Sequence, residues 1–237
     1  MDATQFYLQA QSGCPQGSII SPILTNIYRH TVIDEWFEEI KSTHFSGRAE
    51  ASRYADDVVF TFEKLHDAER FYNTLPKRLN KYSLEMHIDK SQLITAGHLI
   101  AKQAEKEGGK LPTFRFLGFT CYWGKSRKGY WRLKYTSRRD RFSIKLKGMK
   151  TFLRKQLNTE NAQDLLKQVI RVIRGWINYH GISDNKRRVN QFLHISRRII
   201  FRWFNRLGGK HPLTWERYEK ILEAIDFPKD WKTISMF

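Results

Sequence analysis

The order of apolar and polar positions divides the chain into a mixed first half and a helical second half. Apolar side chains recur at i, i+3, i+4 and i+7 from Ile20 to Ile40, which predicts one helix of roughly five turns. Alternating side chains over residues 51–63 predict a β-hairpin, and a helix is expected over residues 67–82 with Pro76 as an interruption. This half therefore combines helices with at least one pair of strands.

The next segments are shorter and less regular. Residues 84–94 predict a short strand or turn, and the polar, glycine-containing residues 101–112 predict an exposed loop. The aromatic-rich residues 114–123 predict a buried strand. A basic strand-turn-strand is expected over residues 124–141, with Gly129 near its turn.

From about residue 140 the pattern is helical to the end, and the clearest helix covers residues 187–207. One face of that helix is mostly apolar and predicts a core contact, whereas Arg198, Arg202 and Arg206 follow the opposite side. The apolar face comprises Val189, Phe192, Leu193, Ser196, Ile200, Trp203, Phe204 and Leu207. The fold class expected is α+β, with the all-α part second.

Charge is distributed very unevenly along the 237 residues. The net charge is +18, and the sequence pI is near 10.0. Residues 1–123 hold 14 basic and 15 acidic side chains, whereas residues 124–237 hold 28 basic and 9 acidic ones. The second half therefore predicts a polyanionic partner. Nucleic acid is favoured over a membrane surface because no single lysine-rich amphipathic helix with a clear insertion face stands out.

Two cysteines, Cys14 and Cys121, show neither metal-ligand spacing nor a disulfide framework, which indicates a reducing compartment. No apolar run approaches the length of a membrane span, and the first ten residues lack the order of a signal peptide. We therefore expect a cytoplasmic protein that has no membrane partner.

Adjacent carboxylates at the predicted hairpin tip, Asp56 and Asp57, are the clearest candidate chemistry. Aspartate pairs in loops are usually structural, but this pair abuts apolar strands. Two carboxylates ~4 Å apart repel by ~1 kcal/mol in water and by more near a protein interior, and a divalent cation such as Mg²⁺ would remove that repulsion. Two-metal phosphoryl transfer would also require a third carboxylate from elsewhere.

Five segments, in order, resemble motifs of reverse transcriptases encoded by group II introns. SGCPQGSIISPILTNIY resembles their loop-and-helix motif, and RYADDVVF resembles the catalytic YxDD hairpin. LEMHIDKSQLI is similar to the next motif, and FRFLGFTCYWGKSRKGYW is similar to the primer-grip region. IRGWINYHGISDNKRRVNQFLHISRRIIFRWFNRLGG resembles the thumb, or maturase, domain, so the resemblance spans about residues 10 to 225.

The resemblance implies a role for each matching residue. Asp56 and Asp57 would be catalytic and would bind two Mg²⁺ ions. The residues implied to contact nucleotide or primer are Gln16, Tyr54, Ala55, Lys90, Phe116, Leu117 and Gly118. Of these, Lys90 would stand near the nucleotide phosphates, although the chemistry of the residue alone favours an exposed lysine without a role. Core packing is an equally good interpretation of Phe116, Leu117 and Gly118.

For the thumb, the resemblance implies binding of intron RNA and of an RNA template with a DNA primer, and dNTPs would be the substrates. The expected RNA-binding side chains are Arg187, Arg188, Arg197, Arg198, Arg202 and Arg206. Aromatic side chains nearby could stack on bases, but we expect Trp176, Tyr179 and Trp203 to be core residues.

The implied domains are residues 1–135, the C-terminal part of a reverse-transcriptase palm, and residues 136–237, the helical thumb. The fingers and the first catalytic aspartate of the family have no match, so we expect this chain alone to be inactive and to need an N-terminal segment, in trans or in a precursor. The alternative is a splicing maturase that binds RNA without polymerising, and a truncated product without a stable role also stays open.

Overall fold

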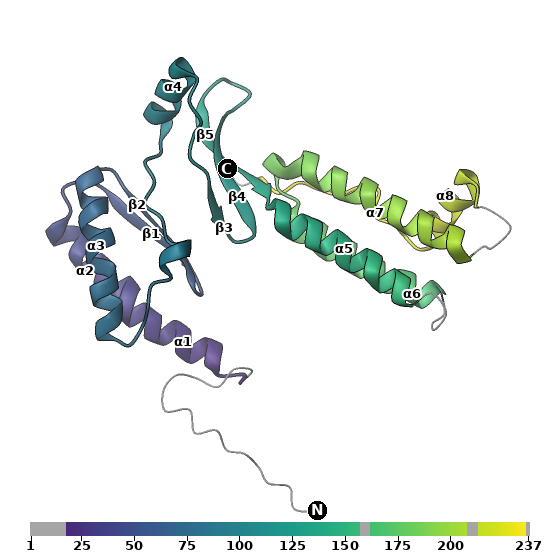
Figure 1. Ribbon diagram of the computed structural model, residues 1–237, viewed down its shortest axis with the longest axis horizontal. Helices are drawn as coiled ribbons and strands as arrows, with labels where there is room; N and C mark the ends of the chain where they lie inside the picture. Colours follow the sequence, from purple (N-terminus) through teal and green to yellow (C-terminus); the bar gives the residue numbers. More distant parts are fainter. Residues whose placement is uncertain (1–17, 157–161, 208–212, 236–237) are drawn as a thin grey trace, which may run out of the picture. The chain divides into compact units, whose positions relative to one another are not determined.

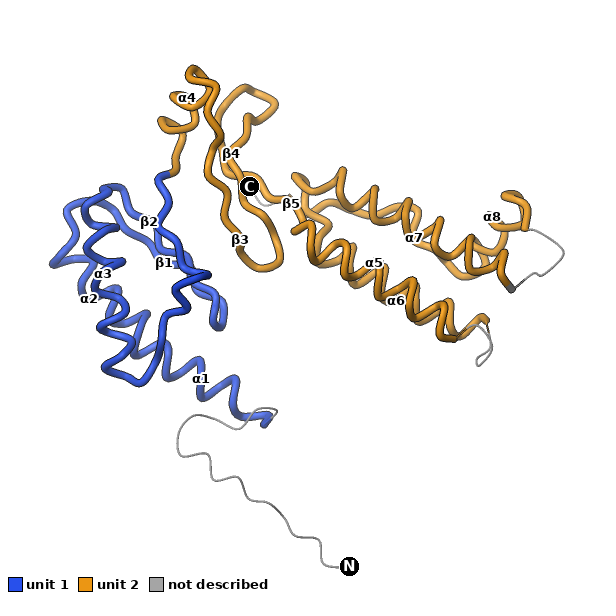
Figure 2. Tube along the Cα trace, viewed as in Figure 1, with its two compact units in different colours: residues 1–95 blue, residues 96–237 orange. Residues whose placement is uncertain are grey.

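The computed structural model describes residues 18–156, 162–207 and 213–235. The chain forms two compact units, residues 1–95 and residues 96–237 (Figure 2). The three strands that follow residue 113 belong to the second unit together with the long helices. The predicted boundary at residue 135 separates functional parts rather than compact units, and it stays a prediction.

The first unit packs helices against a two-stranded antiparallel sheet (Figure 1). The predicted first helix is present, but it contains a π-helical segment between two α-helices. The elements are α1 (Ser21–Arg29), the π-helix (His30–Glu35), α2 (Trp36–His44), β1 (Ala49–Tyr54), β2 (Asp57–Phe62), α3 (Leu65–Lys81) and a 3₁₀ turn (Ile88–Lys90).

An aromatic cluster forms the core of this unit. Phe37 of α2 is buried, and its ring centroid lies 5.1 Å from that of Phe60 in β2 and 5.4 Å from that of Phe71 in α3. Alternation along β1 and β2 turns one face of the hairpin towards these rings, as the sequence pattern predicts. The apolar face of α1, unlike this cluster, is open to solvent: Ile23 and Ile27 are 59% and 60% exposed.

Pro76 does not interrupt α3, contrary to the sequence prediction. Proline inside a helix removes one backbone hydrogen bond and costs about 3 kcal/mol. Phe71, Leu75 and Leu79 lie on the buried face of the same helix, and their burial offsets that cost because each contributes about 1.5–3 kcal/mol. Packing therefore decides the conformation at this position.

The second unit begins with α4 (His98–Glu107), where the sequence predicted an exposed loop from residue 101 onwards. Its composition of Ala, Lys, Gln and Glu favours a helix, and Ala101 is fully buried. Gly108 ends the helix in the left-handed region, with φ 67°.

A three-stranded antiparallel meander follows, in the order β3 (Phe114–Phe116), β4 (Phe119–Lys125) and β5 (Trp131–Ser137). The single strand predicted for residues 114–123 is wrong, because a two-residue turn divides it into β3 and β4. The basic strand-turn-strand is confirmed, and Gly129 lies in its turn with φ 84°.

Four α-helices complete the second unit: α5 (Arg139–Lys155), α6 (Ala162–His180), α7 (Lys186–Leu207) and α8 (Trp215–Ala224), with a 3₁₀ turn (Ser183–Asn185) before α7. Their apolar stripes meet in one core, which includes Leu165 and Ile173 of α6 and Phe192 and Ile200 of α7. The helical pattern therefore predicted the architecture, although the segment after α8 is not helical and instead pairs Ile234 with Ile182.

Candidate active site and nucleic-acid interface

The two adjacent acids lie at the tip of the β1–β2 hairpin. Tyr54 and Asp57 are the last pair of the ladder, so Ala55 and Asp56 form the two-residue turn. Ala55 has a φ of 51°, in the left-handed region that a non-glycine residue rarely adopts. Such strain persists where the surrounding structure imposes it, and it is frequent at functional sites.

A protein cation neutralises one of the two carboxylates. Arg29, at the end of α1, donates from Nη1 to Oδ1 of Asp56, and the Asp56 side chain is otherwise 78% exposed. No hydrogen bond or ion pair reaches the Asp57 carboxylate from the residues that the structure describes. The repulsion expected between adjacent acids is thus relieved at Asp56, and Asp57 is left open to solvent.

A second arginine–carboxylate pair holds the hairpin against the preceding helices. Arg53 in β1 donates from Nε to Oδ1 of Asp34 at 2.8 Å and from Nη2 to Oδ2 at 2.6 Å. The hydrogen bond from Arg53 lowers the pKa of Asp34, and the same contact raises the pKa of Arg53. The Nη1 of Arg53 also donates to Asn26 of α1 at 3.1 Å.

Sequence reasoning missed Arg29, Asp34 and Arg53. The strand pattern could have revealed Arg53, because this residue alternates with Ala49 and Ala51 and therefore lies on the inward-facing side of β1. A charge in that position needs a partner, although the strand pattern cannot say which carboxylate supplies it.

The described residues do not form a complete two-metal site. Carboxylate oxygens suit a hard divalent cation, and Asp56 and Asp57 provide such oxygens. However, no group of three or more His, Cys, Asp or Glu side chains that could hold a metal occurs within the described ranges. Two acids, one of them bonded to Arg29, are fewer donors than two-metal phosphoryl transfer requires.

The other nucleotide-contact candidates are only partly brought together. Tyr54 is adjacent to the acids and 67% exposed, and Ala55 is in the turn itself. Lys90 is exposed in the 3₁₀ turn, and among the described residues no hydrogen bond or ion pair joins it to the hairpin. Gln16 lies outside the described residues.

Of the primer-contact candidates in the second unit, Phe116 ends β3, and Leu117 and Gly118 form the β3–β4 turn. Both turn residues are left-handed, with φ 45° at Leu117 and 75° at Gly118, as a two-residue hairpin turn of type I′ requires. Tyr179 of α6 donates from its hydroxyl to the carbonyl oxygen of Leu117 at 2.9 Å. The backbone N–H of Arg138 donates to the carbonyl oxygen of Gly118 at 3.1 Å, so the turn is held from two sides.

A buried asparagine joins the meander to the helices. The Oδ1 of Asn185 accepts from the backbone N–H of Ser137, and its Nδ2 donates to the carbonyl oxygen of His180, both at 2.9 Å. His180 packs on Trp176, with 3.8 Å between ring centroids, and burial lowers the pKa of its imidazole to about 4. The imidazole is therefore neutral at physiological pH.

The six RNA-binding candidates of α7 fall into two groups. Arg188 lies over the ring of Phe142 at 4.9 Å, and Arg197 is paired with Glu219 of α8. The other four are exposed on α7: Arg187, Arg198, Arg202 and Arg206. Helical geometry thus leaves a basic surface on this helix opposite its buried stripe.

Of the three aromatic residues expected in the core, two are buried and one is exposed. Trp176 and Trp203 are buried, as predicted. Tyr179 is 56% exposed and stacks on Phe119, so its assignment to the core is wrong. Its position at the end of α6 brings it to the β3–β4 turn instead.

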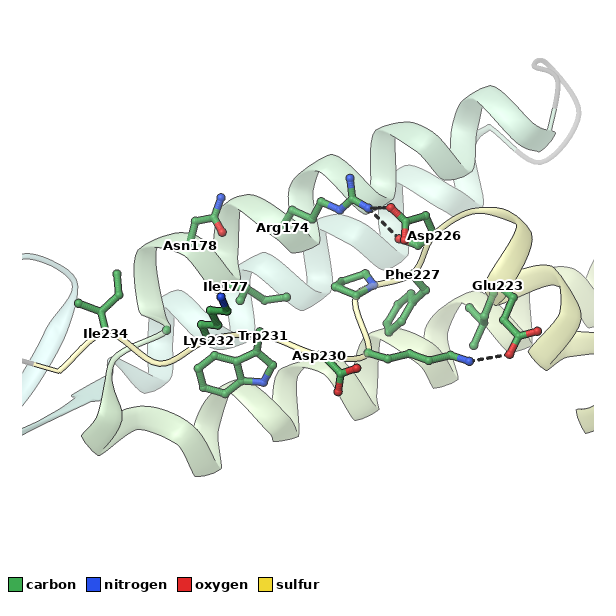
Figure 3. Close-up of a pocket in the computed structure, with 14 residues that line it drawn as sticks. Arg174, Ile177, Asn178, Glu223, Asp226, Phe227, Asp230, Trp231, Lys232 and Ile234 are labelled. Atoms are coloured by element: carbon green, nitrogen blue, oxygen red, sulfur yellow. Dashed lines mark hydrogen bonds and ion pairs between the residues drawn. The ribbon is translucent and has the colours of Figure 1, made fainter.

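A cavity of about 760 Å³ is bounded by α6, α8 and the segment that follows α8 (Figure 3). Ion pairs at its rim, between Arg174 and Asp226 and between Lys229 and Glu223, neutralise much of its charge. This cavity is therefore a poor candidate for a polyanion, and the exposed arginines elsewhere are better ones.

Comparisons with known families agree with this geometry. Residues 2–121 match the family described as reverse transcriptase (RNA-dependent DNA polymerase), so the chain belongs to the reverse transcriptase family. Residues 143–220 match the maturase-specific domain of group II introns, and the two matches together indicate a group II intron reverse transcriptase/maturase. A comparison with curated proteins found no match. No helix in the described part of the chain is long and apolar enough to cross a membrane.

Proposed function

We propose that the chain is the palm and thumb portion of an RNA-directed DNA polymerase of group II intron type. The observation that carries the proposal is the pair Asp56 and Asp57 at the exposed tip of a strained hairpin, inside the segment that matches the reverse transcriptase family. Its partners would be intron RNA, an RNA template with a DNA primer, and dNTPs, in the cytoplasm. Residues 1–135 would form the palm part and residues 136–237 the thumb.

In this proposal Asp57 and Asp56 are the ligands of the divalent metal ions that the family generally uses, and Mg²⁺ fits their hard oxygens. Tyr54 and Ala55 would lie against the primer terminus and the incoming nucleotide. Arg29 holds the Asp56 carboxylate at the turn and would have to release it, or share it, when a cation binds. Because the described residues provide only two of the acids, we propose that this chain alone does not polymerise.

Gln16 and Lys90 would contact the nucleotide, and Phe116, Leu117 and Gly118 would seat the primer. The hydrogen bonds from Tyr179 and Arg138 to the β3–β4 turn support the last assignment, because a grip on a primer must be rigid.

The alternative function is an RNA-binding splicing maturase that does not polymerise. Two observations favour it: the incomplete set of acids among the described residues, and four exposed arginines on α7 within the match to the maturase-specific domain. In this case the six arginine candidates would bind intron RNA, with Arg188 and Arg197 contributing less because they already contact Phe142 and Glu219.

Primer extension on an RNA template with dNTPs and Mg²⁺ tests the first proposal. The chain and its Asp57→Asn variant are compared, each alone and with an N-terminal reverse-transcriptase segment added in trans. Glu69→Gln, which changes an exposed acid of α3, is the matched control. If polymerisation depends on Asp57, any extension disappears in Asp57→Asn and persists in Glu69→Gln, whereas equal extension by both variants removes the carboxylate assignment.

The same samples distinguish the alternative. Both functions predict no extension by the chain alone, so the separating result is the one obtained with the N-terminal segment: extension that Asp57→Asn abolishes supports the polymerase. No extension with that segment, combined with tight RNA binding that Asp57→Asn leaves unchanged, favours the maturase. Absence of both extension and RNA binding would contradict both functions.

A further inference from the structure

A second hollow in the unit of residues 96–237, separate from the α7 surface, is lined by positive charges without a partner among the described residues. It has a volume of about 440 Å³ and lies where the β3–β4 hairpin meets the start of α5. We call it the arginine notch, and its lining is Arg115, Thr120, Arg138, Arg139, Asp140 and Ser143. None of these residues was a candidate from the sequence.

Local backbone geometry explains why these side chains converge. Arg115 of β3 and Thr120 of β4 are cross-strand partners, so both side chains project from the same face of the sheet. The backbone N–H of Arg138 donates to the carbonyl oxygen of Gly118, which brings the first turn of α5 against the end of the same hairpin. The notch is thus assembled from two segments that the fold itself fixes.

The single acid in the notch is already neutralised. Arg138 donates from Nη2 and Nε to the two carboxylate oxygens of Asp140, at 2.6 and 3.1 Å. This contact lowers the pKa of Asp140 to about 2, so the carboxylate is ionised and paired at physiological pH. The charges of Arg138 and Asp140 therefore largely cancel.

Two guanidinium groups remain. Arg115 and Arg139 are exposed, and neither has a hydrogen-bond or ion-pair partner among the residues that the structure describes. The hydroxyls of Thr120 and Ser143, which line the same hollow, are also without a partner in those ranges. Two like charges held in one small hollow favour an anion with several acceptor oxygens.

We propose that the arginine notch binds one backbone phosphate of a nucleic-acid strand, with Arg115 and Arg139 donating to its oxygens. This inference rests on the proposed function, because it assumes that the chain binds nucleic acid. A phosphodiester suits the notch because its two unesterified oxygens can accept from both guanidinium groups and from a hydroxyl, and a nucleic-acid strand supplies this group. The notch would then fix the register of the strand beside the β3–β4 turn without reading its sequence.

The test measures binding of a fluorescein-labelled RNA–DNA duplex by anisotropy over a range of salt concentrations. The double variant Arg115→Gln/Arg139→Gln should bind about tenfold more weakly, and the salt slope should fall by about 0.7–0.9, because one phosphate contact is lost. Arg171→Gln/Arg217→Gln removes the same charge from exposed sites elsewhere in the unit and is the matched control. The variant Arg115→Lys/Arg139→Gln, which keeps the charge at position 115, should recover part of the affinity that the double variant loses.

A methylphosphonate scan of the duplex gives the decisive comparison. One neutral linkage should weaken binding of the unmodified protein by about tenfold and should weaken binding of the double variant no further, because the contact is already lost. Equal losses in both proteins at every linkage, or a double variant that behaves like the control, would overturn the notch as a phosphate site. Thermal unfolding of each variant verifies that the fold is retained.

The outcomes also separate this inference from the function on which it rests. If the unmodified chain binds the duplex and the double variant binds equally well, only the notch is wrong. If the unmodified chain does not bind nucleic acid at all, the proposed function fails as well.

Discussion

Replacing Asn185 by alanine should destabilise the second unit more than any other single exchange of an asparagine there. Its side chain makes four hydrogen bonds across the joint between the meander and the helices. Oδ1 accepts from the N–H of Ser137 at 2.9 Å and from the hydroxyl of Thr136 at 3.2 Å. Nδ2 donates to the hydroxyl of Ser137 at 2.6 Å and to the carbonyl oxygen of His180 at 2.9 Å.

The expected loss in the free energy of unfolding depends on which of the four partner groups can form another hydrogen bond. The two hydroxyls can rotate to other hydrogen-bond partners, but the N–H of Ser137 and the carbonyl of His180 are fixed by the backbone. Ser137 and Asn185 are each 1% exposed, so water is not available at that point. A buried group without a partner costs about 1–3 kcal/mol, and two such groups therefore lower the free energy of unfolding by about 4 kcal/mol.

Urea unfolding followed by tryptophan fluorescence is a suitable assay. Six of the seven tryptophans lie in residues 96–237, so the signal reports mainly on the second unit. With a denaturant slope of about 2 kcal/mol per M, the midpoint should fall by about 2 M. Far-UV circular dichroism should give the same midpoint if the unit unfolds cooperatively.

Asn178→Ala is the matched control, because Asn178 is exposed on α6 and should shift the free energy of unfolding by less than about 0.5 kcal/mol. A loss below about 1 kcal/mol in Asn185→Ala would refute the reasoning. It would mean that the joint relaxes or admits water, and that the four hydrogen bonds do not hold the meander in place.

Two further predictions concern acid stability and RNA binding. Burial lowers the pKa of His180 to about 4 from an ordinary value near 6.5, so protons bind the unfolded chain more readily in that interval. The free energy of unfolding should therefore fall by about 3 kcal/mol as the pH drops from about 6.5 to about 4, and His180→Phe should remove this part of the acid sensitivity in urea titrations. Changing Arg198, Arg202 and Arg206 to alanine should weaken RNA binding and flatten its salt dependence by 0.7–0.9 per lost contact, and an unchanged slope in anisotropy titrations would show that this surface does not touch RNA.

Periodicity predicted the long elements correctly because their burial is continuous. The stripe of α7 that includes Val189, Phe192 and Ile200 is buried, and the opposite side carries exposed arginines, as the 3.6-residue pattern indicates. The β1–β2 hairpin was equally visible, since alternation and the acids at its tip mark two strands and a turn. In both places each residue's own neighbours in sequence carry the signal.

Short or polar elements were predicted poorly because one tertiary contact decides them. Residues 98–107 form a helix whose buried side chain is a single alanine, Ala101, and such a small residue leaves no periodic signal. The turn at Leu117 and Gly118 was read as continuous strand, because nothing in the local pattern reveals that Tyr179, 62 residues later, donates a hydrogen bond to it.

By itself the sequence determined the α+β class, the basic second half and the acids of the hairpin, because periodicity, charge and motif spacing are local properties. The tertiary structure alone decided which charges remain free. Asp56 is paired with Arg29 across 27 positions and Arg53 with Asp34 across 19, whereas Arg115 and Arg139 have no partner among the described residues and line one hollow. A sequence shows which side chains are charged, but only folding brings a counter-charge within bonding distance of some and leaves others to bind a ligand.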